Sequence, residues 1–274
     1  MEHTNLKTLE RRVEVSHLGV RVHDPAGEFD ANLYLPASHG KAPLVIVVHG
    51  FMRTKAKMAD WGRHLAEQGF AVAVPTLPAW ADHVRNARAI CELIDWTLAN
   101  VPTADMDTER AGLVGFSAGG LATLLAANDP RVRVWVGLDP VDVAGKGAAA
   151  AKRVSAFALV LRAEPHSCNG HGNAQGIQAA LTARSLCLMV RGATHADPEW
   201  PTDFAGRSRL RKVIESPACL VRPLRHGRLA IRAAIRPKSQ GRPRRRRTRC
   251  RGTYAVKTVR PWPSAQLRRL IFLG

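Results

Sequence analysis

The sequence lacks several features that would assign it to a specialised class of protein. No apolar run approaches the roughly 20 residues that a membrane-spanning helix needs, and residues 1–15 contain no apolar segment typical of a secretory signal. The five cysteines are an odd, scattered set in a long chain, which is typical of reduced thiols. We therefore expect a cytoplasmic protein with no membrane span.

The sequence also has none of the common signals for a bound cofactor. Neither G-x-x-x-x-G-K-[ST] nor G-x-G-x-x-G occurs, so no such glycine loop is available to hold nucleotide phosphates. His166, Cys168 and His171 stand close together in "HSCNGH", but a fourth ligand for zinc is not evident. We expect neither a metal nor a cofactor.

Acidic residues are almost absent from the end of the chain. Residues 206–274 hold 21 of the 41 Lys and Arg residues but only one of the 22 Asp and Glu residues. This Arg-rich tail therefore accounts for the net charge of +19 of the whole chain, and the first 205 residues are close to neutral. The composition of the tail predicts either a disordered basic extension or the product of a wrong reading frame, with candidate short helices at 209–215 and 229–235. A genuine extension over 207–274 would bind polyanions through charge alone.

Residues 1–205 alternate apolar strands with amphipathic helices. The patterns predict strands at 13–22, 29–36, 42–50, 69–78, 110–117, 132–140, 156–165 and 185–195, and helices at 56–68, 82–98, 119–128 and 172–184. This alternation predicts one α/β domain with a mainly parallel central sheet flanked by helices. Only 16 residues separate Asp139 from Ala156, so no large cap domain fits between those strands.

The stretch "GLVGFSAGG", residues 112–120, places Ser117 between a strand and a helix. The pattern Gly-x-Ser-x-Gly in that setting is typical of a nucleophile elbow, where glycines permit a tight turn that lifts the hydroxyl above the sheet. An ordinary strand-to-helix loop rich in Gly and Ser is the alternative. We interpret Ser117 as a nucleophile because both flanks have the required structure.

A serine hydroxyl needs a base, and the base needs an orienting acid. His195 follows the last strong strand, in "GATHADPEW", and is our candidate base. Two carboxylates compete for the role of acid: Asp139 ends the strand after the elbow, and Glu164 ends the strand after that. Position in the order Ser, acid, His favours the later strand, and Asp142 is a weaker third candidate.

These candidates all lie at the carboxyl ends of predicted strands, where sites form in such sheets. An anionic intermediate at Ser117 needs backbone donors. We expect them to be the amide of Ala118, at a helix N-terminus, and the amide of Phe51, in "HGFM" after the third strand. Trp80 and Trp200 are candidate substrate contacts, with core packing as the alternative for each.

Four of these stretches together, "VVHGF", "VGFSAGG", "GLDPVD" and "GATHADPEWPTD", resemble the α/β-hydrolase superfamily. The resemblance covers about residues 10–205 and points to the chlorophyllase and dienelactone-hydrolase-like branch, near the cutinase-like polyester hydrolases. In chlorophyllase-type members the acid belongs to a "DPV" motif, which implies Asp139. In cutinase-like members it follows the next strand, which implies the region of Glu164.

The resemblance implies hydrolysis of a small-molecule carboxylic ester through an acyl-enzyme, without a cofactor. It also implies a closing helix on the sheet, for which the Arg-rich tail offers no convincing candidate. Two alternatives stay open. One is a nucleic-acid-binding protein that uses residues 207–274, and the other is a catalytically inactive α/β-hydrolase fold that serves as a partner module.

Overall fold

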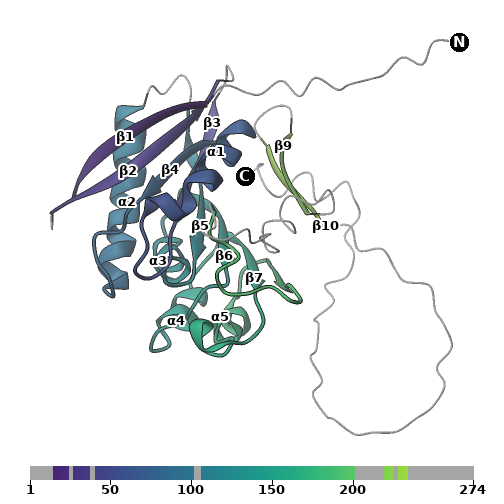
Figure 1. Ribbon diagram of the computed structural model, residues 1–274. Coiled ribbons are helices and arrows are strands. Elements are labelled where there is room, and N and C mark those ends of the chain that lie inside the picture. Colours follow the sequence, from purple (N-terminus) through teal and green to yellow (C-terminus); the bar gives the residue numbers. More distant parts are fainter. Residues whose placement is uncertain are drawn as a thin grey trace, which may run out of the picture.

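The computed structural model describes residues 15–24, 27–37, 41–101, 106–200, 219–224 and 228–233 (Figure 1). The elements are β1 (Val15–Asp24), β2 (Gly27–Pro36), β3 (Ala42–Val48), η1 (Lys55–Met58), α1 (Ala59–Glu67), β4 (Ala71–Pro75), α2 (His83–Asn100), β5 (Met106–Phe116), α3 (Ala118–Ala126), β6 (Val132–Leu138), α4 (Lys146–Ala151), β7 (Phe157–Arg162), η3 (Ser167–Asn169), α5 (Ala174–Ala180), β8 (Ser185–Met189), β9 (Cys219–Leu224) and β10 (Arg228–Ala233). Strand and helix alternate from β3 to β8, as the sequence predicts.

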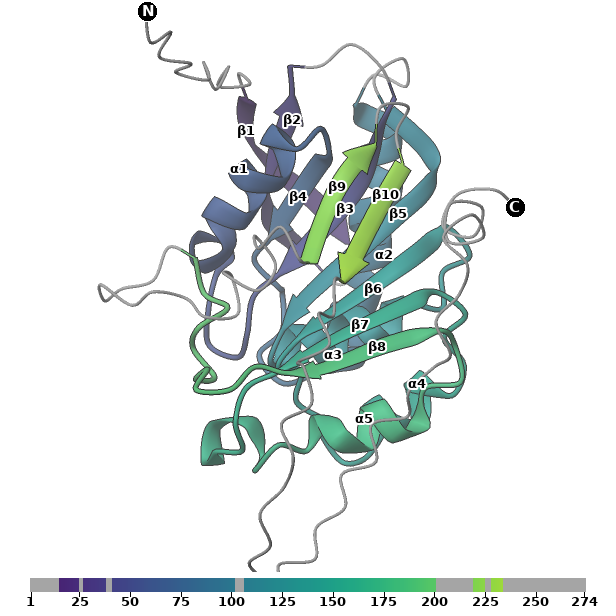
Figure 2. The same cartoon turned by 90° about the vertical axis from the view of Figure 1, so that its right-hand side faces the viewer.

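Eight strands form one sheet in the order β1-β2-β4-β3-β5-β6-β7-β8. The β1–β2 and β2–β4 pairs are antiparallel, and every pair from β4 to β8 is parallel. This arrangement confirms the predicted fold class of a mainly parallel sheet flanked by helices (Figures 1 and 2). Because the parallel strands run in one direction, the loops after β3 and after β5 to β8 leave the same edge of the sheet.

The strand β3 shows how the sequence produces the layers. All seven of its residues are buried. Leu44, Ile46 and Val48 join a core cluster with residues of α2, α3, α4 and α5. Val45 and Val47 point to the opposite face and join the cluster that contains residues of α1. The alternation follows from the two-residue period of a strand, and it explains why this strand lacks polar positions.

The connection between β6 and β7 contains one helix, α4, that the sequence analysis did not predict. The stretch "KGAAAA" lacks the spaced large apolar residues that indicate a helix. With only this six-residue helix, the segment leaves no room for a large cap domain, as expected.

The prediction of a helix at 229–235 is wrong, because Arg228–Ala233 forms strand β10, paired antiparallel with β9. The other candidate helix of the Arg-rich tail, 209–215, lies outside the described residues. So does most of the stretch 207–274 for which polyanion binding is expected.

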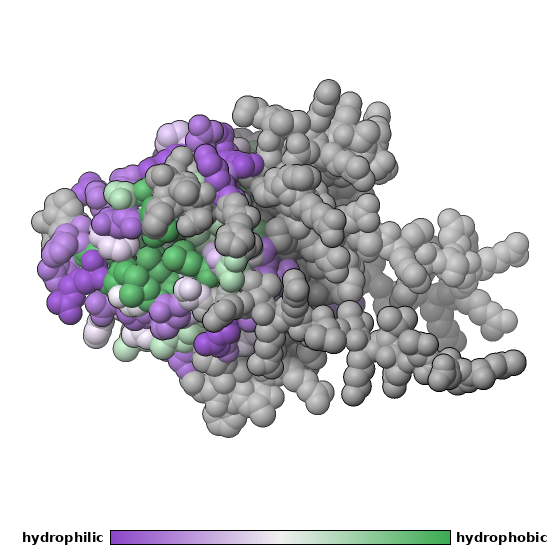
Figure 3. All heavy atoms as spheres, turned by 90° about the horizontal axis from the view of Figure 1, so that it is seen from above, coloured by the Kyte–Doolittle hydropathy of each residue, from purple (hydrophilic) through white to green (hydrophobic). Residues whose placement is uncertain are grey.

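Seen from above, apolar residues gather in one area bordered by hydrophilic ones (Figure 3). The large apolar side chains that are exposed among the described residues are Leu18, Phe51, Met52, Trp80, Val84, Val143 and Met189. Within the described ranges, none of the helices has both the length and the apolar character that crossing a membrane requires.

Candidate active site

Ser117 lies at a sharp turn between β5 and α3. Its backbone angles are φ 54° and ψ −121°, a conformation that is unfavourable for a residue with a side chain. Two of its backbone hydrogen bonds join the turn to the end of β6 and the residues after it: Ser117 N donates to Leu138 O at 3.1 Å, and Ser117 O accepts from Val141 N at 3.1 Å. The end of β6 therefore stabilises the strained strand-to-helix turn that the Gly-x-Ser-x-Gly pattern predicts.

The glycines around Ser117 are required by close backbone contacts. A Cβ atom on Gly115 would lie 2.2 Å from Thr123 Oγ1 and 2.4 Å from Gly119 O. A Cβ atom on Gly119 would lie 2.1 Å from His49 O. Since Cβ atoms do not approach other atoms within 3.0 Å, only glycine lets α3 pack directly on β5 and on the residue that follows β3.

His195 lies between Ser117 and Asp139 and is within hydrogen-bond distance of both. Its Nδ1 is 2.7 Å from Asp139 Oδ2, and its Nε2 is 2.9 Å from Ser117 Oγ. In the neutral tautomer with its proton on Nδ1, the ring donates to the Asp139 carboxylate and accepts from the serine hydroxyl at Nε2. The three residues come from the loops after β5, β6 and β8, and the sheet edge brings them together.

Asp139 is a buried carboxylate, 1% exposed, whose position is fixed from several sides. Its backbone has φ 44°, and its amide donates to Leu161 O at 2.6 Å. Its Oδ1 accepts a hydrogen bond of 2.9 Å from the amide of Ala163. Both neighbours belong to β7 or directly follow it, so the adjacent strand supports the carboxylate that faces His195.

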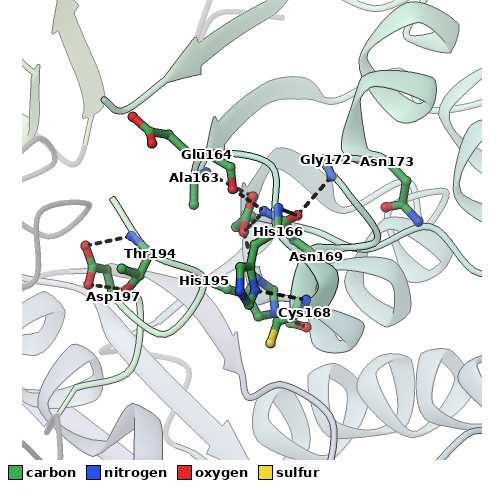
Figure 4. Close-up of polar contacts among 12 residues, drawn as sticks. Ala163, Glu164, His166, Cys168, Asn169, Gly172, Asn173, Thr194, His195 and Asp197 are labelled. Carbon is green, nitrogen blue, oxygen red and sulfur yellow. Dashed lines mark hydrogen bonds and ion pairs between the residues drawn. The ribbon is translucent and has the colours of Figure 1, made fainter. Parts of the chain in front are cut away.

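The other two carboxylates considered for this role lie elsewhere. Glu164 is exposed, and its Oε1 accepts from Gly192 N at 2.7 Å. Figure 4 shows its carboxylate directed away from His195. Asp142 accepts from the amides of Gly147 and Ala148 with its two oxygens, at the start of α4. Of the three, only Asp139 forms a hydrogen bond with His195.

His49 shapes the turn after β3, where one oxyanion donor is expected. Its Nδ1 is 2.8 Å from Gly50 O, and its Nε2 accepts from Leu77 N at 2.9 Å. The carbonyl acceptor and the amide donor together require the neutral ring with its proton on Nδ1. Burial lowers the pKa of His49 below 6.5, which agrees with a neutral ring. His49 thus joins the turn after β3 to the loop after β4.

The expected oxyanion donors occupy two adjacent elements. Ala118 is the first residue of α3, so its amide stands at the positive end of the helix dipole. Phe51 lies in the turn after β3, and a Cβ atom on neighbouring Gly50 would lie 3.2 Å from Ser117 Cβ. This close approach brings the turn beside the serine. The assignment of Phe51 and Ala118 as donors stays a prediction.

The two tryptophans expected at the site have different surroundings. Trp80 follows β4 at the same edge of the sheet and is 74% exposed. Trp200 packs edge-to-face on Trp61, with ring centres 5.6 Å apart, and against His64. Its backbone also pairs with Lys57 and Asp60. Packing therefore accounts for Trp200, while a substrate contact stays a prediction for both residues.

The loop that carries His195 contacts residues of the connection between β3 and β4. Thr194 Oγ1 donates to Asp197 Oδ1 at 2.8 Å, and Trp61 Nε1 donates to Pro198 O at 2.7 Å. The buried carboxylate of Glu199 pairs with Arg53 at 2.6 Å. The contacts of Trp61 and Arg53 join the histidine loop to α1 and to the segment before η1. The sequence analysis missed Glu199 and Arg53, because they are 146 residues apart.

The stretch "HSCNGH" contains a further residue that the sequence analysis missed. Asn169, 1% exposed, donates from Nδ2 to Asp139 Oδ2 at 3.0 Å. His166 Nδ1 accepts from the amide of Cys168, so its ring caps the short helix η3. Among the residues that the structure describes, no group of three or more His, Cys, Asp and Glu side chains is arranged to hold a metal ion.

Comparison with known protein families gives one match over more than half of the chain. A family model described as PET hydrolase-like matches residues 12–171. This range contains Ser117, Asp139 and the turn after β3, and it ends before His195.

Curated proteins give similarities over shorter stretches. An α/β hydrolase, ucsC, from Acremonium sp is 29% identical over 148 residues, which is 47% of this chain and 30% of that protein. Chlorophyllase-2 from Arabidopsis thaliana is 24% identical over 126 residues, 41% of this chain and 40% of its own. A putative carboxymethylenebutenolidase from Methylorubrum extorquens is 27% identical over 135 residues, 43% of this chain and 46% of its own. The chain thus spans less than half the length of these relatives.

Proposed function

The chain belongs to the PET hydrolase-like family of α/β-hydrolases, and on that basis we propose that it is a serine esterase that cleaves carboxylic esters through an acyl-enzyme. The coarser statement, a hydrolase of the chlorophyllase and dienelactone-hydrolase-like branch, rests on the relatives. The finer statement rests on the hydrogen bonds of His195 to Ser117 and Asp139.

In the first half of the proposed reaction, Ser117 Oγ attacks the carbonyl carbon of the ester while His195 Nε2 takes the hydroxyl proton. The amides of Phe51 and Ala118 stabilise the oxyanion of the tetrahedral intermediate. His195 then gives the proton to the leaving alcohol as the ester C–O bond breaks. The acyl group remains on Ser117.

In the second half, His195 takes a proton from water, and the resulting hydroxide attacks the acyl carbon. Collapse of the second intermediate returns the proton to Ser117 Oγ and releases the carboxylic acid. Asp139 keeps the Nδ1 proton of His195 in place and stabilises the imidazolium in both halves. No redox step or additional reactant is needed.

Replacement of the nucleophile tests this proposal. Ser117→Ala should lower the kcat for hydrolysis of p-nitrophenyl butyrate by about 10⁶-fold, because it removes the hydroxyl that lies 2.9 Å from His195 Nε2. Ser167→Ala, at an exposed serine of η3, serves as the matched control and should retain the activity of the unchanged protein. Undiminished hydrolysis by Ser117→Ala would rule the proposal out.

A second proposal concerns the Arg-rich tail, and its charge favours it. We propose that residues 207–274 bind polyanions without sequence specificity, independently of Ser117. Salt-sensitive binding of random DNA should then persist in Ser117→Ala and disappear when residues 207–274 are deleted.

The domain boundary at 205/206 and the cytoplasmic location stay predictions. The coding DNA around codon 206 distinguishes a genuine tail from a wrong reading frame.

A further inference from the structure

The segment that follows β7, residues 163–172, donates hydrogen bonds to both carboxylate oxygens of Asp139. The amide of Ala163 donates to Asp139 Oδ1 at 2.9 Å, and the side chain of Asn169 donates to Asp139 Oδ2 at 3.0 Å. Glu164, from the same segment, accepts from Gly192 in the loop that carries His195. One loop therefore contacts both the carboxylate and the histidine loop (Figure 4).

Asn169 uses every hydrogen-bonding position of its side chain. Besides the bond to Asp139, its Nδ2 donates to Glu164 O at 2.9 Å. Its Oδ1 accepts from the amides of His166 and Gly172 at 2.8 and 2.9 Å. An amide offers two donors and two acceptor sites, so this buried side chain is fully paired and held in one orientation.

Three hydrogen bonds hold the carboxylate of Asp139 in one orientation. Oδ2 accepts from both Asn169 Nδ2 and His195 Nδ1, and Oδ1 accepts from Ala163. With donors on both oxygens, the carboxylate has little freedom to rotate. The direction of the Asp139–His195 hydrogen bond sets the tilt of the imidazole ring, and the tilt sets where Nε2 meets Ser117 Oγ.

We propose that Asn169 is a positioning residue that holds the Asp139 carboxylate in the orientation His195 needs; this inference rests on the proposed esterase function. Asn169 does not touch the substrate or the reacting atoms and acts only through Asp139. Its loss lowers kcat and leaves KM nearly unchanged, because substrate binding does not involve it. A displacement of about 1 Å at the reacting groups is sufficient for a loss of about 10²-fold.

The residue directly after this loop provides a matched control. Asn173, the N-cap of α5, uses its side chain in two hydrogen bonds to the backbone of Asp142 rather than to Asp139. Asn173→Ala therefore removes a similar loop attachment without touching the carboxylate. Asn169→Asp is a second variant of nearly equal volume, which replaces the amide donor by an oxygen facing Asp139 Oδ2.

The test is a double-mutant cycle on p-nitrophenyl butyrate, with rates expressed per folded protein as measured by near-UV circular dichroism. Asn169→Ala and Asn169→Asp should each lower kcat by about 10- to 100-fold with KM changed less than about twofold. Asn173→Ala should stay within about threefold of the unchanged protein. In an Asp139→Ala background, which retains residual activity, Asn169→Ala should cause no further loss.

Two results would overturn the inference. One is an unchanged kcat in folded Asn169→Ala or Asn169→Asp. The other is an equal loss from Asn169→Ala with and without Asp139, which would mean that Asn169 acts only on the stability of the loop. Failure of the proposed function differs from both, because the unchanged protein would then lack hydrolysis that depends on Ser117.

Discussion

The substitution Gly119→Ala is expected to damage the site without changing any functional side chain. The added Cβ would lie 2.1 Å from the carbonyl oxygen of His49 and 2.9 Å from Val48 Cγ1, whereas ordinary contact begins near 3.4 Å. The oxygen belongs to the backbone, so no side-chain rotation relieves the clash. The helix α3 and the turn after β3 must therefore separate by about an ångström.

The effect of Gly119→Ala on stability is the sum of two opposing contributions. Alanine favours a helix over glycine by about 1 kcal/mol, but overpacking a close contact costs about 1–3 kcal/mol. The clash therefore prevails, and the two elements that move apart carry the proposed oxyanion donors Ala118 and Phe51. A displacement of about 1 Å between groups that must act together lowers kcat by about 10²-fold.

The assay compares kcat on p-nitrophenyl butyrate and the melting temperature with those of a matched glycine variant. Gly176 lies in α5 with no atom within 4 Å of an added Cβ. Gly176→Ala should therefore keep kcat and raise the free energy of unfolding by about 0.5–1 kcal/mol. If Gly119→Ala keeps kcat within about twofold and melts no lower than the unchanged protein, the close contact between α3 and β3 does not position the site.

Two further predictions concern the acid and a buried histidine. Asp139→Asn should lower kcat by about 10³- to 10⁴-fold. The kcat of Glu164→Gln should stay within about threefold of that of the unchanged protein, because glutamine retains an oxygen that accepts from Gly192 N. A larger loss from Glu164→Gln than from Asp139→Asn in steady-state assays would reverse the assignment of the acid. Burial holds the pKa of His49 below 6.5 in the folded state, so the unfolded state binds more protons below pH 6.5. This contribution to stability is fully present above the unfolded pKa and is lost as the pH falls toward the folded pKa. Denaturation between about pH 8 and pH 5 should show a shallower decline for His49→Gln than for the unchanged protein, and equally steep declines would contradict this prediction.

The strands up to β8, most of the helices between them and the serine turn could be predicted from the sequence, because they depend on short-range rules. The continuous apolar run of β3 indicates a strand buried on both faces, and the glycines around Ser117 indicate a turn that larger residues cannot form. The sequence missed α4 because alanines carry no apolar period. It also predicted a helix where β10 lies.

Tertiary structure decided which groups meet at the sheet edge. Asp139 and Glu164 both follow strands that end there. Position in the order Ser, acid, His favoured Glu164, whereas the resemblance through the "DPV" motif favoured Asp139. In the folded chain the carboxylate of Asp139 is hydrogen-bonded to His195, and that of Glu164 accepts from the amide of Gly192. The hydrogen bond from Asn169 to Asp139 could not be predicted either, because it joins residues 30 positions apart in the chain. Side-chain direction at a loop depends on packing between elements distant in sequence, and only the folded chain fixes it.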